Sequence, residues 1–299
     1  MCRNRLHKFV SGSCLGLYLL CLPVLIHAQS SVQVLDDTNT SVVLDAPAQR
    51  IVSLAPHLTE LLFSIGAGSR IVGTVRFSDF PEAAKEIPVL GDAFTINIES
   101  IVALQPDLVV AWRTGGTSSV VEKLRHLGIA VYVNEAYDLE SIAGSAYILS
   151  QLVGQEETGR NLEKHFLQQL AMLRAGNVDT DRKVFFQISD HNLYTVNDDH
   201  LIGQAISVCG VRNVYGSSEI PVPIVSRESV LAANPDVIVI SQPAKGTESP
   251  WVEKWSEFEG YEDRIRLINP ALISRPSLRM VQGISELCRL VRNEQHHED

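Results

Sequence analysis

The stretch ESIVALQPDLVV, residues 99–110, recurs 129 positions later as ESVLAANPDVIV, residues 228–239. Each copy predicts a short helix with an acidic residue in its first turn, then a Pro-Asp turn that ends the helix, then a β-branched run. Such a run is typical of a strand buried on both faces of a parallel sheet. The repeat therefore predicts two similar lobes, and two facing α/β lobes form a cleft suited to a small molecule. Chance similarity between two helix-strand junctions is the alternative.

The segments before and after the two repeats also predict strands that alternate with helices. Residues 32–44 predict a hairpin, and the strands and helices after it follow one another singly, which favours largely parallel sheets covered by helices on both faces. Strands are expected at 50–54, 71–75, 107–112, 129–133, 184–188 and 265–268, and helices at 56–65, 117–127, 201–208 and 278–291.

The middle of the chain predicts two longer helices, at 139–153 and 156–174. In the second, Leu162, Phe166, Leu170 and Leu173 form one apolar stripe. A helix of that length spans about 28 Å at a rise of about 1.5 Å per residue, enough to join two lobes and hold their angle nearly fixed. We expect an N-terminal lobe at 29–154, an inter-lobe helix at 155–176 and a C-terminal lobe at 177–299.

Residues 1–28 have the pattern of a signal peptide. Arg3, Arg5 and Lys8 form a basic start, residues 10–26 are apolar and rich in leucine, and Ala28 is a small residue suited to cleavage. The pattern predicts export to the periplasm. A retained membrane anchor is the alternative, because the apolar run approaches the length of a spanning helix.

The charge balance disfavours nucleic acid as a partner. The chain has 25 basic and 35 acidic residues. Removal of residues 1–28 takes away three basic residues and no acidic ones, which leaves a mature net charge of −13. Such a chain repels phosphate backbones. The chain can bury a large core, since 45% of the residues are hydrophobic. We expect it to act as a monomer.

Two of the five cysteines remain after the signal peptide is removed. Cys209 and Cys288 form an even pair in an oxidising compartment, where a disulfide is the default. Closing a loop of that size restricts the unfolded chain by about 4.5 kcal/mol at most. Two free buried thiols are the alternative, and the pair is too isolated for a metal site.

Several short motifs stand out along the chain: Arg50 to Pro56 with Thr59-Glu60, Ser78 to Pro81, Ala111 to Arg113, Val225 to Glu228, and the placement of both cysteines. They resemble motifs of the helical-backbone periplasmic binding proteins that serve iron-siderophore, haem and cobalamin importers. The resemblance covers residues 32–292 and is closest to the cobalamin branch. It implies a class III solute-binding protein: two Rossmann-like lobes joined by one long helix, which deliver a ligand from the periplasm to the permease of an ABC importer.

The resemblance also implies a ligand site, which the chain keeps in part. Trp112 is retained at the carboxyl end of a strand, where ligands of open α/β sheets bind, although a core tryptophan is the alternative. Aromatic residues of the cobalamin pattern are replaced by Ala93, Val222 and Leu272, and Ala271 stands in place of an acidic residue. The expected ligand-binding residues are Phe77, Phe94, Trp112, His191, Tyr194 and Arg275.

Cobalamin is the expected ligand, and haem or a ferric siderophore is the alternative. In the alternative, His191 or Tyr194 would contact iron, although a surface-loop histidine is a simpler interpretation. Arg275 would meet an anionic ligand edge or remain solvated. No cofactor or metal of the protein's own is expected.

Glu99 and Glu228 are equivalent residues of the two repeats. Carboxylates in a first turn offset the helix dipole by about 0.3–1 kcal/mol, which alone would explain them. In the resembled family these positions project from the lobe tips and pair with arginines of the permease. We therefore expect them to dock on a two-fold symmetric transporter.

An exported enzyme is the remaining alternative. Ser53, His57 and Asp79 are reactive residue types, but they are dispersed. No nucleophile motif, phosphate-binding glycine loop or paired-histidine metal motif is present, so we expect binding without catalysis.

Overall fold

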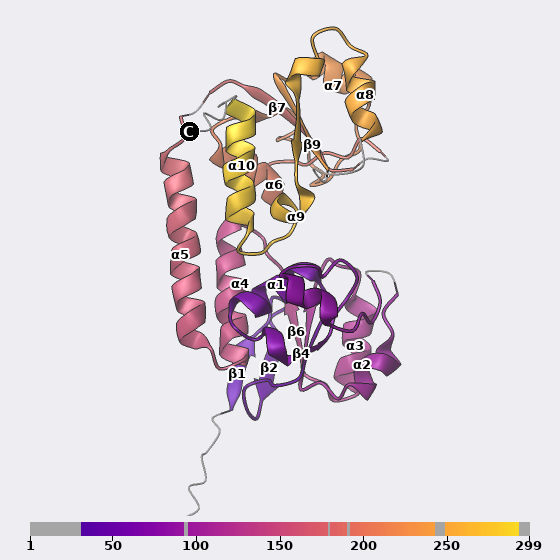
Figure 1. Ribbon diagram of the computed structural model, residues 1–299, viewed down its shortest axis with the longest axis vertical. Helices are drawn as coiled ribbons and strands as arrows, with labels where there is room; N and C mark the ends of the chain where they lie inside the picture. The colour runs from indigo at the N-terminus through magenta and orange to yellow at the C-terminus, as the bar shows by residue number, and fades with distance from the viewer. Residues whose placement is uncertain (1–30, 93–94, 179, 190–191, 243–248, 293–299) are drawn as a thin grey trace, which may run out of the picture.

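The computed structural model describes residues 31–92, 95–178, 180–189, 192–242 and 249–292, so the expected signal peptide lies outside the described residues. Two lobes are stacked along the long axis of the molecule, and the helix α5 (Glu156–Ala175) runs along one side of both (Figure 1). The two-lobed parallel α/β fold predicted from the sequence is confirmed. The proposed lobe boundaries at 154–155 and 176–177 remain a prediction.

The N-terminal lobe contains a four-stranded parallel sheet in the order β4-β3-β5-β6. The expected hairpin precedes it as the antiparallel pair β1 (Val32–Leu35) and β2 (Ser41–Leu44). The strands are β3 (Ile51–Ser53), β4 (Ile71–Gly73), β5 (Leu108–Trp112) and β6 (Val131–Asn134). The helices are α1 (Pro56–Ser64), α2 (Ile98–Ala103) and α3 (Ser118–His126), with short 3-10 turns at Gly68–Arg70 and Glu82–Glu86.

The C-terminal lobe repeats this order as β8-β7-β9-β10, again parallel throughout. Its strands are β7 (Lys183–Gln187), β8 (Arg212–Asn213), β9 (Val237–Ser241) and β10 (Ile265–Ile268). Its helices are α6 (Leu201–Val208), α7 (Arg227–Ala233), α8 (Pro250–Ser256), α9 (Pro270–Ile273) and α10 (Met280–Arg292), with a 3-10 turn at Glu262–Arg264.

The two sequence repeats have the same local structure. The residue before each Pro-Asp turn, Gln105 or Asn234, has a φ of 46°, which turns the chain out of the helix. The carboxylate of Asp107 accepts the backbone N–H of Arg50 at 3.0 Å, and that of Asp236 accepts the backbone N–H of Lys183 at 2.7 Å. Each aspartate thus fixes β5 or β9 beside its central neighbour, β3 or β7.

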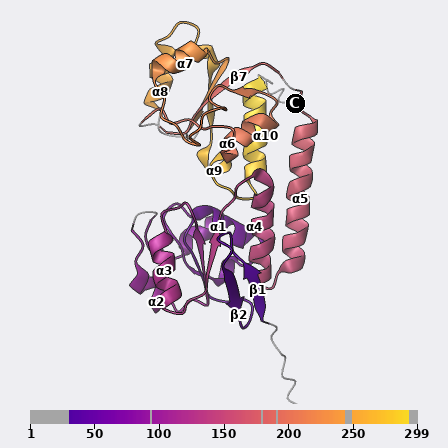
Figure 2. The ribbon, with the colours of Figure 1, turned by 180° about the vertical axis from the view of Figure 1, so that it is seen from behind.

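Two helices, rather than α5 alone, connect the lobes. The helix α4 (Leu139–Leu152) packs its first turns in the core of the C-terminal lobe, through Leu139 and Ile142. Its last turns pack in the core of the N-terminal lobe, through Leu149 and Leu152. Because α4 and α5 run side by side in both views, the link between the lobes is a packed helical pair (Figures 1 and 2).

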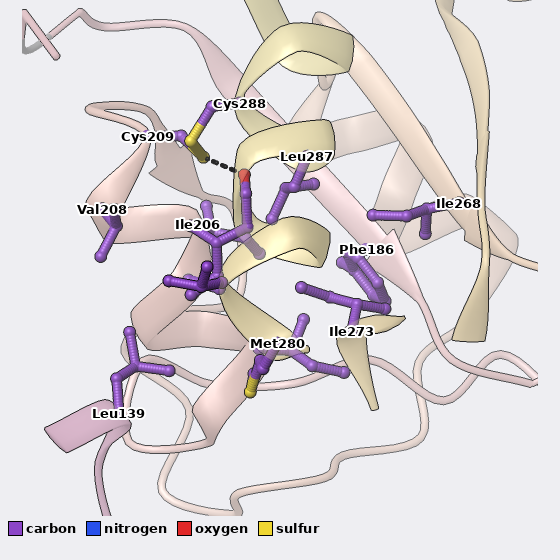
Figure 3. Packing of buried hydrophobic residues seen from close by; sticks show 14 of the residues in the cluster. Leu139, Phe186, Ile206, Val208, Cys209, Ile268, Ile273, Met280, Leu287 and Cys288 are labelled. Atoms are coloured by element: carbon purple, nitrogen blue, oxygen red, sulfur yellow. Dashed lines mark hydrogen bonds between the residues drawn. A yellow bond between two sulfur atoms is a disulfide. The ribbon is translucent and has the colours of Figure 1, made fainter. Parts of the chain in front are cut away.

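The predicted disulfide is present in the C-terminal lobe. Cys209, at the end of α6, is bonded to Cys288 on α10. Figure 3 shows the bond beside Ile206 and Leu287, at one end of a core that continues to Ile273 and Leu139. The bond therefore joins two helices that cover the same region of the sheet.

Candidate functional site

A cavity of about 530 Å³ lies between the lobes. The carboxyl ends of neighbouring strands β5 and β6 supply one wall, and the segment before α6 and the turn after α9 supply much of the other. Its lining from the N-terminal side is Trp112, Arg113, Thr114, Glu135, Ala136 and Tyr137; from the C-terminal side it is Asp199, His200, Leu201, Ile202, Pro221, Ile273, Ser274, Pro276 and Met280.

Trp112 is held in a defined orientation on the cavity wall. The edge of its ring system meets His57 at a centroid distance of 5.3 Å, and its Nε1–H donates to Glu135 at 3.3 Å. A Cβ at Gly115 would lie 2.7 Å from the indole, so only glycine fits beneath it. Burial lowers the pKa of His57 to about 4, which keeps this neighbour neutral near pH 7.

Two further rings line the cavity from opposite lobes. Tyr137 is exposed, and its hydroxyl accepts a hydrogen bond from Arg113 at 2.5 Å. Across the cavity, His200 caps α6, because its Nδ1 accepts the backbone N–H of Ile202 at 3.1 Å. This bond places the proton of the neutral ring on Nε2, and burial lowers the pKa of His200.

A buried ionic cluster joins the lobes beside the cavity. The Glu60 side chain on α1 is 2% exposed and accepts hydrogen bonds from Arg275 at 2.9 Å, Ser277 at 2.6 Å and Arg279 at 2.6 and 2.9 Å. Arg275 also pairs with Asp79 at 2.7 Å. The three C-terminal residues lie in the segment between α9 and α10, which reaches towards the N-terminal lobe (Figure 2).

The structure brings only part of the expected site to this cavity. Trp112 lines it, whereas Phe77 and Tyr194 do not belong to its lining. Phe77 is 68% exposed with a φ of 69°, and Tyr194 is half-buried and bridged to Ile224. Arg275 forms ion pairs with Glu60 and Asp79. Phe94 and His191 lie outside the described residues.

Three cavity residues were not singled out from the sequence. Glu135 and Tyr137 follow the strand next to the one that ends at Trp112, so adjacency of two strand ends was the available signal. His200 precedes α6 and caps it, and nothing in the sequence around this cap indicated that the side chain would also line the cavity. In the part of the chain that the structure describes, no group of three or more His, Cys, Asp or Glu residues is arranged to hold a metal ion.

Glu99 and Glu228 are exposed in the first turns of α2 and α7. Their helices begin alike: Asn97 accepts the N–H of Ser100 at 2.8 Å, and Ser226 accepts that of Ser229 at 3.2 Å. Backbone and Ser226 hydrogen bonds lower the pKa of Glu228, so it is charged at neutral pH. Both helices lie on the side of the molecule away from α5, one in each lobe (Figure 1).

The family follows from a comparison with known sequences. Residues 51–262, which include β3 to β9 and the cavity residues from Trp112 to Pro221, match the model of the periplasmic binding protein family. The chain belongs to this family. The match covers most of both lobes and all of the helical pair between them. Among the described helices, none combines the length and hydrophobicity that a bilayer crossing requires.

Similar proteins extend the match to most of the chain. The vitamin B12-binding protein of Vibrio campbellii is 34% identical over 247 residues, which are 82% of this chain and 90% of that protein. The vitamin B12-binding protein of Yersinia pestis is 32% identical over 245 residues, 81% of this chain and 86% of that protein.

Solved structures show the same class III periplasmic binding fold. The periplasmic vitamin B12-binding protein of Vibrio cholerae has a TM-score of 0.75 and 32% identity, over 83% of this chain and 99% of that one. A periplasmic haem-binding protein from Roseiflexus has a TM-score of 0.73 at 23% identity, over 82% of this chain and 98% of that one, which indicates a shared fold.

Proposed function

We propose that this protein is the periplasmic binding component of an ABC importer and captures cobalamin or a related corrinoid between its lobes. The observation that carries the proposal is Trp112, held on the wall of the inter-lobe cavity. The similarity to vitamin B12-binding proteins supports the choice of ligand. The mature protein begins after residue 28, acts as a monomer and binds its ligand without converting it.

A flat macrocycle suits the aromatic residues of this site. Burial against the faces of Trp112, Phe77 and Tyr194 would remove a large apolar area from water. Phe77 and Tyr194 lie outside the present cavity lining and would be reached by a ligand that extends beyond it. Arg275, bonded to Glu60 and Asp79, would border the ligand through this cluster.

Replacing Trp112 with alanine should weaken cyanocobalamin binding at least about tenfold, because an aromatic anchor in a cleft carries a large share of binding energy. Calorimetric titration of the apo-protein with cyanocobalamin, haemin and ferric siderophores measures this and tests the ligand class. Trp112→Phe, which keeps an aromatic face, is the control and should retain most of the affinity. Binding of haemin or a siderophore at micromolar or lower concentration, without cobalamin binding, would replace the proposed ligand by its alternative.

Charge reversal of Glu99 and Glu228 to lysine should impair import and complex formation with the permease. Two equivalent acidic tips fit basic residues on a two-fold symmetric partner. Ligand affinity should stay within about threefold, since both residues lie in exposed first turns outside the cavity lining.

The matched control reverses Glu156 and Glu157, which are exposed in the first turn of α5. It changes the net charge by the same amount, and also in a helix first turn, but α5 lies on another side of the molecule. Pull-down with the permease in detergent compares the two double variants. A large loss of ligand affinity with intact docking would contradict the role proposed for Glu99 and Glu228.

A further inference from the structure

We propose that Glu135 is a specificity-determining residue of the inter-lobe cavity, selecting ligands edged with neutral carboxamides over ligands edged with carboxylates. The inference rests on the proposed function, because it concerns the chemistry of the ligand in that same site. It follows from the position of Glu135, from the charges that surround it and from the donors that face it across the cavity.

Glu135 is fixed on the cavity wall by several hydrogen bonds. Its Oε1 accepts from Trp112 Nε1 at 3.3 Å and from Thr114 Oγ1 at 3.3 Å, and its Oε2 accepts the backbone N–H of Thr114 at 3.1 Å. Its own backbone N–H donates to Asp37 at 2.7 Å. The carboxylate is half-buried, so a ligand placed against Trp112 would lie beside a negative charge that is not free to turn away.

The charges around the cavity do not neutralise this carboxylate. In the described lining, Glu135 and Asp199 are acidic and Arg113 is the basic residue. Arg113 donates to the neutral hydroxyl of Tyr137, so its positive charge remains but is outnumbered by the two carboxylates. The net charge of the lining is therefore negative.

The nearby arginines of the cross-lobe cluster do not change this balance. Arg275 and Arg279 are 16% and 18% exposed, and both are bonded to Glu60, with Asp79 as the second partner of Arg275. Two arginines and two carboxylates cancel within the protein. A carboxylate on a ligand would thus enter a cavity with an acidic wall and with its neighbouring cations already paired, which is unfavourable at short range.

The same wall suits a carboxamide. Its NH₂ group can donate to Glu135 or Asp199, and its oxygen can accept from Arg113 or from the Nε2–H of His200, which is the proton-bearing nitrogen when Nδ1 caps α6. In the described part of the chain, this Nε2 has no hydrogen-bond partner. A carboxylate can bond only to the hydrogen-bond donors of the wall, whereas a carboxamide can bond to both the donors and the acceptors.

The test compares two corrins that lack the nucleotide loop, with cyanocobalamin as the reference. Dicyanocobinamide carries carboxamides at the edge of its ring, and dicyanocobyrinic acid carries carboxylates there. Calorimetry should show that the wild-type protein binds dicyanocobinamide at least about tenfold more tightly. This comparison needs no variant, and equal affinities would overturn the inference even where a substitution prevents folding.

Glu135→Gln keeps one oxygen acceptor beside Trp112, replaces the other oxygen by an NH₂ group and removes the charge. It should improve binding of dicyanocobyrinic acid about threefold to tenfold and weaken binding of dicyanocobinamide, whose NH₂ groups lose a charged acceptor, so that discrimination shrinks. The control Glu122→Gln, at an exposed position on α3, removes an equal charge outside the cavity and should leave discrimination unchanged.

Equal wild-type affinity for the two corrins, or unchanged discrimination in Glu135→Gln, would overturn the role of Glu135. Cyanocobalamin binding in the same experiments would leave the proposed function standing. Failure of all three corrinoids to bind would overturn the proposed function and this inference together.

Discussion

Replacing Glu60 with alanine should lower the free energy of unfolding by about 3–5 kcal/mol, because removal of one partner of a buried ion pair leaves the other charge uncompensated. Two arginines, Arg275 and Arg279, would lose this carboxylate, and Ser277 would lose its acceptor. Urea denaturation, followed by circular dichroism, measures the change. Asp79 would still hold Arg275, so the arginine most affected is Arg279, which also stacks on the ring of Phe80 at 3.6 Å.

The control is Glu82→Ala, which removes a carboxylate from the exposed pair with Lys85 and should leave stability nearly unchanged. A Glu60→Ala variant as stable as the Glu82→Ala variant would show that the cross-lobe cluster contributes little. A destabilised Glu60→Ala protein should also show faster hydrogen exchange between α9 and α10, where the three partners lie.

Removing the disulfide should lower the free energy of unfolding by about 2–5 kcal/mol, because the bond between Cys209 and Cys288 restricts the unfolded chain and joins α6 to α10. The double variant Cys209→Ala/Cys288→Ala, compared with the wild type in urea with and without reductant, measures this. Reductant should destabilise the wild type and leave the double variant unchanged. Two thiols open to alkylation in unreduced secreted protein, detected by intact mass, would contradict the bond.

Much of the fold could be predicted from local patterns. The Pro-Asp turns, the β-branched runs and the apolar stripe of α5 each depend on residues close in sequence, so the elements lie within a few residues of their expected bounds. The helices α8 and α9 were not expected. Both begin at a proline after a capping residue, Ser249 or Asn269, but are too short to show an apolar period.

The site was harder to predict because its contacts join distant segments. Trp112 was identified from its place at a strand end. By contrast, Arg275 was expected at a ligand edge or in solvent, and its carboxylate partner Glu60 is 215 residues away in sequence. Glu60 itself lies on α1 between Thr59 and Leu61, where no local pattern reveals a partner from the other lobe.

The path of α4 has a consequence for how the chain is made. Leu139 and Ile142 pack in a core formed largely by α5 and by the strands and helices of the C-terminal lobe, which are synthesised later. A nascent N-terminal half therefore carries a helix whose first turns expose leucine and isoleucine to water. During translation the protein therefore passes through an incomplete stage that is prone to aggregation. A truncated product ending after α4 would be a substrate for chaperones and proteases rather than a stable half-protein.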